Sequence, residues 1–235
     1  MTPNEVVLQC DGVQLLRYRG ASRKPLSSSA PLLPPLLVVY SLVNRPYILD
    51  LNKERTLIGA WCDAGRDVYL VDWGYPSEHD ARLGLDDYIN RYLHRCVEYL
   101  QTISELGTVD LIGICQGGPF ALCYTALEPA RVRRLALMLA PSDFHTDDFL
   151  LARWLRHIDV DCLINTFGNV PGYLLNWGFI ALKPVSLSGM QALELLDALD
   201  RPQELTAYTQ MQCWLQDSPD QAGKAFAEFT KMFVR

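Results

Sequence analysis

Apolar and polar residues alternate along the first 140 residues in a way that predicts strands separated by helices. Three short, largely apolar runs are typical of strands buried on both faces of a parallel sheet, namely 36–40, 67–72 and 109–114. A further strand is expected over 131–140. Alternating apolar positions on either side of Asp11-Gly12 predict an N-terminal hairpin over 6–18.

Helical periodicity fills the intervals between these strands and predicts helices over 50–64, 86–105 and 119–127. This β-α-β order indicates an α/β fold built on a doubly wound, mostly parallel sheet. The Ser- and Pro-rich segment 22–35 predicts a surface loop.

The pattern changes after Pro141, where no strand-like run follows and amphipathic helices are expected. We therefore expect two domains, an α/β core over 1–142 and a helical cap over 143–235 that covers the carboxyl ends of the strands. The expected cap helices are 147–157, 172–182, 188–199, 202–216 and 219–233.

Charge, apolar segments and cysteine spacing argue against several classes of function. With 21 Lys and Arg against 27 Asp and Glu, the net charge of −6 argues against a nucleic-acid partner. No basic region opens the chain, which predicts no signal peptide, and the apolar stretch 30–43 is shorter than the roughly 20 residues of a transmembrane helix. Seven cysteines without C-x-x-C spacing predict neither disulfides nor a metal site, as expected in a reducing cytoplasm.

The segment Gly113-Ile114-Cys115-Gln116-Gly117-Gly118 directly follows an apolar run. It predicts a strand that ends in a glycine-lined turn, with a thiol at the apex, and continues as a helix. This pattern resembles the nucleophile elbow of the α/β-hydrolase fold, with cysteine in place of serine. Because a thiolate is a strong nucleophile, the pattern favours acyl transfer through a thioester on Cys115. The alternative is a small buried side chain, the usual role of a free cysteine and the one expected of Cys123.

An elbow nucleophile needs hydrogen-bond donors for the oxyanion that forms during acyl transfer. One donor is expected to be the backbone N–H of Gln116, the residue after the nucleophile. The other is expected from the loop 41–46, where Val43 or Asn44 would supply its N–H. The alternative interpretation of this loop is a simple strand-to-helix turn that ends at Pro46.

The general base is harder to assign, because in this fold the acid and then the histidine follow the nucleophile. Only His145 and His157 follow Cys115. Asp143 and His145 are the candidate acid and base, although residues so close in sequence seldom orient one another. His157 is expected on the surface or in the packing of the cap.

Several further stretches form a more specific pattern together with the elbow: 42–51, 67–76, 85–90, 111–118, 143–146, 168–172, 174–177 and 217–223. Together they resemble the catalytic subunit of class III polyhydroxyalkanoate (PHA) synthases over nearly the whole chain. The G-x-C-x-G motif alone would be shared with dienelactone hydrolases and other thiol hydrolases.

The resemblance implies an acyltransferase that polymerises (R)-3-hydroxyacyl-CoA, such as 3-hydroxybutyryl-CoA, into polyesters such as poly(3-hydroxybutyrate). Cys115 would carry the growing chain as a thioester, and coenzyme A would be part of the substrate, with no further cofactor and no metal. Such enzymes act as dimers with a second, non-catalytic subunit at the surface of cytoplasmic storage granules. The aromatic residues Trp154 and Trp177 would either line a route for the polyester or pack in the cap core.

The chain departs from the family pattern in one respect. Family members continue beyond the segment 231–235 with further core strands, the catalytic aspartate and the catalytic histidine, and nothing here matches them. We therefore expect a truncated copy whose C-terminal core strands are missing; recruitment of another histidine is the alternative. The rival functions are a thiol hydrolase and a catalytically incomplete fragment that only binds a partner subunit or the granule.

Overall fold

A computed structural model describes residues 1–19, 32–146, 150–182, 193–196, 198–199 and 201–234. The chain divides into two compact units. The first unit comprises Met1–Leu42, Leu49–Tyr75 and Leu85–Ser142, and the second comprises Val43–Ile48, Pro76–Gly84 and Asp143–Arg235.

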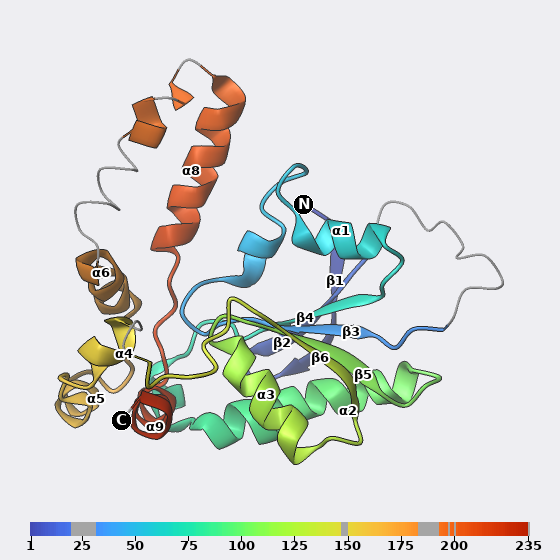
Figure 1. The fold of residues 1–235 in the computed structure, drawn as a ribbon, viewed down its shortest axis with the longest axis horizontal. Coiled ribbons are helices and arrows are strands. Elements are labelled where there is room, and N and C mark those ends of the chain that lie inside the picture. Colours follow the sequence, from blue (N-terminus) through green and yellow to red (C-terminus); the bar gives the residue numbers. More distant parts are fainter. Residues whose placement is uncertain (20–31, 147–149, 183–192, 197, 200, 235) are drawn as a thin grey trace. The chain divides into compact units, whose positions relative to one another are not determined.

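The first unit is built on a six-stranded sheet with the order β1-β2-β4-β3-β5-β6 (Figure 1). The strands β3, β4, β5 and β6 are parallel to one another, whereas β1 and β2 run antiparallel at one edge. Their bounds are β1 Asn4–Cys10, β2 Val13–Tyr18, β3 Leu36–Val39, β4 Val68–Asp72, β5 Val109–Ile114 and β6 Val132–Met138. Every predicted strand is therefore confirmed.

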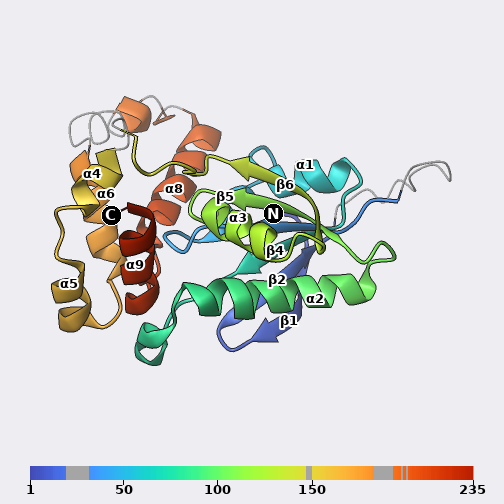
Figure 2. The ribbon, with the colours of Figure 1, turned by 60° about the horizontal axis from the view of Figure 1, so that its bottom comes forward.

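Helices lie on both faces of this sheet, α1 on one face and α2 and α3 on the other (Figures 1 and 2). The central strands are buried for this reason: every residue of β3 is buried, and Val38 lies in register with Leu70 and Ile112. The helices are α1 Leu57–Asp63, the π-helical segment η3 Asp87–Leu93 with its continuation α2 His94–Ile103, and α3 Gly117–Leu127. The α/β-hydrolase-type core, doubly wound and mostly parallel, is thus confirmed.

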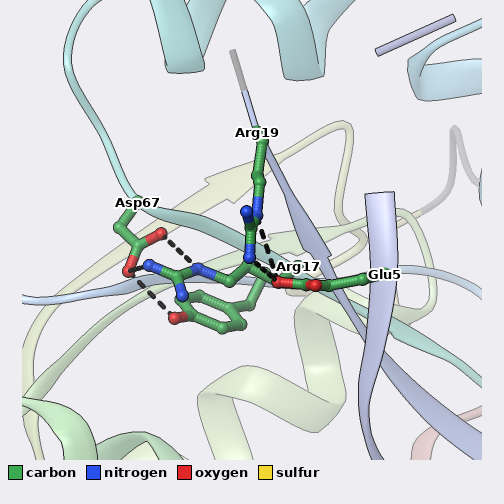
Figure 3. A network of polar contacts seen from close by, with 5 residues as sticks. Glu5, Arg17, Arg19 and Asp67 are labelled. Atoms are coloured by element: carbon green, nitrogen blue, oxygen red, sulfur yellow. Dashed lines mark hydrogen bonds and ion pairs between the residues drawn. The ribbon is translucent and has the colours of Figure 1, made fainter. Parts of the chain in front are cut away.

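The N-terminal hairpin is fixed to the sheet by polar contacts (Figure 3). Arg17 on β2 donates two hydrogen bonds of 3.0 Å to the carboxylate of Asp67, which also accepts 2.9 Å from the hydroxyl of Tyr69. Arg19 pairs with Glu5 on the neighbouring strand β1. Because these side chains are partly open to solvent, the ion pairs help set the register of the hairpin more than they add stability.

The helix predicted over 50–64 is wrong in its first half, since α1 begins only at Leu57. The side chain of Thr56 caps the helix by accepting the N–H of Gly59 at 2.7 Å. The carboxamide oxygen of Asn52 accepts the backbone N–H groups of Glu54 and Arg55, which holds the preceding segment in a turn. Such local side-chain bonds compete with helix formation.

The second unit is helical. Its helices are η2 Glu78–Arg82, α4 Leu150–Leu155, α5 Val160–Phe167, α6 Gly172–Leu182, α8 Pro202–Gln216, α9 Gly223–Phe229 and η4 Thr230–Val234, and η1 Pro46–Leu49 begins within this unit. The helix α5 was not predicted; the side chain of Asp159 caps it by accepting the N–H of Cys162. Two apolar clusters hold the helices together, one around Val160, Val170 and Phe226 and the other around Phe144, Ala152 and Val234.

Some sequence expectations fall outside the described residues, namely most of the predicted loop 22–35, the start of helix 147–157 and much of helix 188–199. In the described part of the chain, no helix is both long and apolar enough to cross a membrane.

Candidate functional site

The turn between β5 and α3 places Cys115 at its apex. Cys115 has a φ of 53°, in the left-handed region that is costly for a residue with a side chain. Two backbone hydrogen bonds hold this conformation: the N–H of Cys115 donates to the carbonyl of Met138 at 3.1 Å, and the N–H of Gly118 donates to the carbonyl of Cys115 at 2.9 Å. A strained nucleophile between a strand and a helix is the geometry of a nucleophile elbow.

The glycines of the motif are required for space. A Cβ on Gly113 would lie 2.6 Å from the Cα of Gly118, and one on Gly118 would lie 2.2 Å from the Cβ of Ala140. A Cβ on Gly117 would lie 2.2 Å from the carbonyl oxygen of Val39. Any side chain at these positions would therefore push α3 away from the sheet and move the thiol.

The surroundings of the Cys115 thiol act on its ionisation in opposite directions. The residue is exposed at its surface, yet burial by the protein on its other sides raises the pKa of the thiol. The backbone N–H of Gln116 and the hydroxyl of Ser41 hydrogen-bond to the sulfur and lower the pKa, without offsetting the burial. A thiolate at Cys115 would therefore be stabilised by two donors, whereas burial favours the neutral thiol.

The side chain of Gln116 has a role that the sequence analysis missed. Its Oε1 atom accepts the N–H of Leu42 at 3.1 Å and lies 3.4 Å from the hydroxyl oxygen of Ser41. All three residues are buried. The carboxamide therefore holds the loop after β3 against the turn at Cys115. In the sequence, the signal for this role is a polar residue, Gln116, directly after Cys115 in an otherwise apolar and glycine-rich segment.

The loop with the second predicted oxyanion donor lies in the second unit, as part of Val43–Ile48. The side chain of Asn44 donates to the hydroxyl of Ser218 at 2.7 Å, and this hydroxyl donates to Asn176 at 2.9 Å. The indole N–H of Trp214 donates to the carbonyl of Arg45 at 2.7 Å. Asn44 and Arg45, the two residues after Val43, are thus fixed, and the role of Val43 as an oxyanion donor stays a prediction.

Asp143 and His145 contact each other in the second unit, but the contact is to the backbone of His145 and not to its ring. The carboxylate of Asp143 accepts the backbone N–H of His145 at 2.9 Å. The ring Nδ1 of His145 lies 3.3 Å from a guanidinium nitrogen of Arg156. In a catalytic acid–base pair the carboxylate accepts the ring N–H instead. A role as base would require these contacts to change, and it stays a prediction.

The other histidines are placed as follows. His94 is the one histidine in the sequence of the first unit, and its ring lies 3.1 Å from the hydroxyl of Tyr124 and 3.4 Å from the carboxylate of Glu98. His79 and His157 are exposed, which for His157 is the surface position rather than packing in the cap. Within the described residues, no group of three or more His, Cys, Asp and Glu side chains is arranged to hold a metal ion.

Three of the motif stretches come together in the second unit. Val170 and Gln221 form an isolated antiparallel bridge, and the N–H of Gly172 donates to the carboxylate of Asp220 at 2.9 Å. A Cβ on Gly172 would lie 2.0 Å from the carbonyl oxygen of Ser218, so the backbones touch directly. The stretches 168–172, 174–177 and 217–223 therefore build one hydrogen-bonded framework.

The fold and the elbow agree with a comparison against protein families, in which residues 34–230 match the model of the alpha/beta hydrolase fold. The chain belongs to the α/β-hydrolase fold family. This match covers most of both units.

Relatives within the family match the whole chain. The proteins named poly(3-hydroxyalkanoate) polymerase subunit PhaC from Allochromatium vinosum and Thiocystis violacea are 46% and 45% identical over 235 residues. The protein of the same name from Synechocystis is 41% identical over 240 residues. Each match covers 100% of this chain but only 65%, 65% and 62% of the relatives, so the chain spans less than two thirds of their length. The predicted resemblance to PHA synthases is confirmed.

Proposed function

We propose that this α/β-hydrolase chain carries the nucleophile of a PHA synthase, an acyltransferase that polymerises (R)-3-hydroxyacyl-CoA with release of CoA. The observation that carries the proposal is Cys115 at the apex of a strained elbow, with the N–H of Gln116 and the hydroxyl of Ser41 at its sulfur. Polymerase relatives that match the full length of the chain support this choice of substrate class.

In the first half-reaction, the thiolate of Cys115 attacks the thioester carbonyl of the acyl-CoA. The N–H groups of Gln116 and Val43 donate hydrogen bonds to the carbonyl oxygen and stabilise the negative charge that develops on it. A donor of this kind contributes about 3–4 kcal/mol to transition-state stabilisation. The bond between the carbonyl carbon and the CoA sulfur then breaks, CoA leaves and takes up a proton, and the acyl group remains on Cys115 as a thioester.

In the second half-reaction, the 3-hydroxyl of another monomer attacks this thioester while a base takes its proton. The new ester bond forms as the bond to the Cys115 sulfur breaks. We place the base and its acid partner in the part of the relatives' length that this chain does not span. His145 with Asp143 is the alternative within the chain.

The second unit would act as a cap that excludes water, so that the hydroxyl rather than water accepts the acyl group. Trp154 and Trp177 are 40% and 65% exposed, and Tyr173 packs edge to face on Trp177 with ring centroids 5.4 Å apart. This exposure favours contact with an apolar polyester over packing in the cap core. A homodimer, a second synthase subunit and a location at cytoplasmic granules complete the proposal.

The test is CoA release from (R)-3-hydroxybutyryl-CoA by the parent chain, by Cys115→Ala and by Cys123→Ala. Cys123 is the matched control, since it is a half-buried thiol on the helix α3 that follows the elbow. At alkaline pH, where the thiolate forms without a base, the parent and Cys123→Ala are expected to release CoA as the acyl group passes to Cys115, and Cys115→Ala is expected to fall to the rate without protein. Equal release by the parent and Cys115→Ala would refute the role of Cys115. No release by a folded parent would instead favour the incomplete fragment that only binds a partner or the granule.

A further inference from the structure

Ser41, the second residue after β3, brings a buried hydroxyl to the nucleophile. Ser41 is 3% exposed, its hydroxyl hydrogen-bonds to the side chain of Cys115, and it lies 3.4 Å from the Oε1 atom of Gln116. From the sequence, Ser41 was expected only as part of the loop 41–46, with no contact to Cys115. Its hydroxyl therefore contacts the reacting atom itself.

A serine hydroxyl has one proton and can donate it to one acceptor at a time. Here two acceptors are within reach, the carboxamide oxygen of Gln116 and the sulfur of Cys115. The carboxamide oxygen also accepts the N–H of Leu42 at 3.1 Å, so it keeps a donor when Ser41 turns away. Buried acceptors left without a donor are costly, and this arrangement avoids that cost.

Charge decides which acceptor receives the proton. A hydrogen bond to an ionised acceptor is roughly twice as strong as one between neutral groups. We infer that Ser41 is a catalytic residue whose hydroxyl donates to Gln116 while Cys115 is a thiol and turns to donate to the sulfur once it is a thiolate. When the sulfur attacks the carbonyl carbon, the negative charge passes to the carbonyl oxygen and the hydroxyl returns to Gln116.

This inference rests on the proposed role of Cys115 as the nucleophile, but its test does not require polymer synthesis. Alkylation of Cys115 by iodoacetamide reports the thiolate directly, because only the ionised sulfur reacts at an appreciable rate. The rate at each cysteine is measured by peptide mass spectrometry from neutral to alkaline pH. Cys162 and Cys213 are exposed thiols and serve as references within the same molecules.

The variants are Ser41→Ala, which removes the hydroxyl, Ser41→Thr, which keeps it, and Ser104→Ala as a control. Ser104 is also a serine of the first unit that bonds to a carbonyl, that of Thr108 at 3.4 Å. Ser41→Ala is expected to move the midpoint of Cys115 alkylation up by about one pH unit, which is about tenfold slower reaction below the midpoint. The plateau at high pH stays the same, Ser41→Thr restores the midpoint, and neither Ser104→Ala nor the reference cysteines change.

An unchanged midpoint in a folded Ser41→Ala protein would overturn the inference, because a structural role alone leaves the ionisation of Cys115 as it was. Circular dichroism establishes that the variant is folded. Should Ser41→Ala fail to fold, Ser41→Gly removes the same hydroxyl and decides the question by the same readout. A shifted midpoint together with equal CoA release by the parent and Cys115→Ala would keep the contact of Ser41 with Cys115 and refute the proposed function instead.

Discussion

Cys115 lies at the apex of the turn between β5 and α3 and carries the thiol that we propose as the nucleophile. Its left-handed conformation turns the chain sharply between β5 and α3, and the N–H of Gln116 hydrogen-bonds to its sulfur. Strain of this kind persists only where the surrounding structure imposes it. The surroundings that impose it are β6, which accepts the N–H of Cys115, and the backbone of β3, which lies against Gly117.

The substitution Gly117→Ala tests this close approach. The added Cβ would lie 2.2 Å from the carbonyl oxygen of Val39 and 2.6 Å from that of Tyr40, and neither can yield without moving the backbone. We expect the free energy of unfolding, measured in urea, to fall by about 3 kcal/mol, the upper range for overpacking a close-packed site.

The matched control for this substitution is Gly12→Ala in the hairpin turn. Nothing lies within 4 Å of the position that its Cβ would occupy. Gly12→Ala is therefore expected to leave the free energy of unfolding nearly unchanged. Equal effects of the two substitutions would show that close packing at Gly117 does not hold the elbow.

At the scale of elements, apolar runs were sufficient to predict the sheet. The strands β3, β4 and β5 are buried on both faces, and a continuous apolar run is the direct consequence of such burial. Helix starts were less predictable: Thr56 and Asp159 decide where α1 and α5 begin, through single side-chain caps that leave no periodic signal.

The candidate site likewise combines a local turn, which the sequence predicts, with contacts between distant positions, which it does not. The place of Cys115 and Gln116 in a turn between a strand and a helix was predictable because this turn has its own motif. The contacts of Ser41 and Leu42 with the Gln116 side chain join positions 75 and 74 residues apart, and only the parallel pairing of β3 with β5 brings them together. The sequence places Asp143 and His145 two residues apart. The ring of His145, however, contacts Arg156, which lies 11 residues later and which no local motif indicates.

At the scale of the whole molecule, burial shifts the ionisation of many thiols and phenols in the first unit in one direction. Burial raises the pKa of Cys96 and of Tyr92 to about 12 each, from ordinary values of 9.0 and 10.0. Burial also raises the pKa of the other shifted thiols and phenols of this unit, which are Cys115, Cys123, Tyr18, Tyr40, Tyr69 and Tyr124. In the folded chain these groups keep their protons to higher pH than in the unfolded chain.

The sign of the pH dependence follows from these shifts. Above the ordinary pKa of a thiol or phenol, the unfolded chain binds fewer protons than the folded chain, so stability falls as pH rises. The stabilisation is fully present below about pH 9 and is lost as pH rises toward the folded values near 12. Urea unfolding at stepwise pH is expected to show this decline, and Cys96→Ala is expected to make it less steep. Stability that stays level or rises from pH 9 upward would contradict the assignment.

The region that matches the α/β-hydrolase fold includes most of both units, and the polymerase relatives extend well beyond the length of this chain. The proposed function therefore depends most on one reaction that can be measured with this chain alone. This reaction is the transfer of an acyl group from CoA to Cys115.

The most direct measurement is to incubate the chain with (R)-3-hydroxybutyryl-CoA at alkaline pH, where the thiolate forms without a base, and to map the adducts by peptide mass spectrometry. A 3-hydroxybutyryl thioester is expected on Cys115 before any forms on the exposed Cys162 and Cys213. Acylation spread evenly over the exposed cysteines, or absent from Cys115, would contradict it.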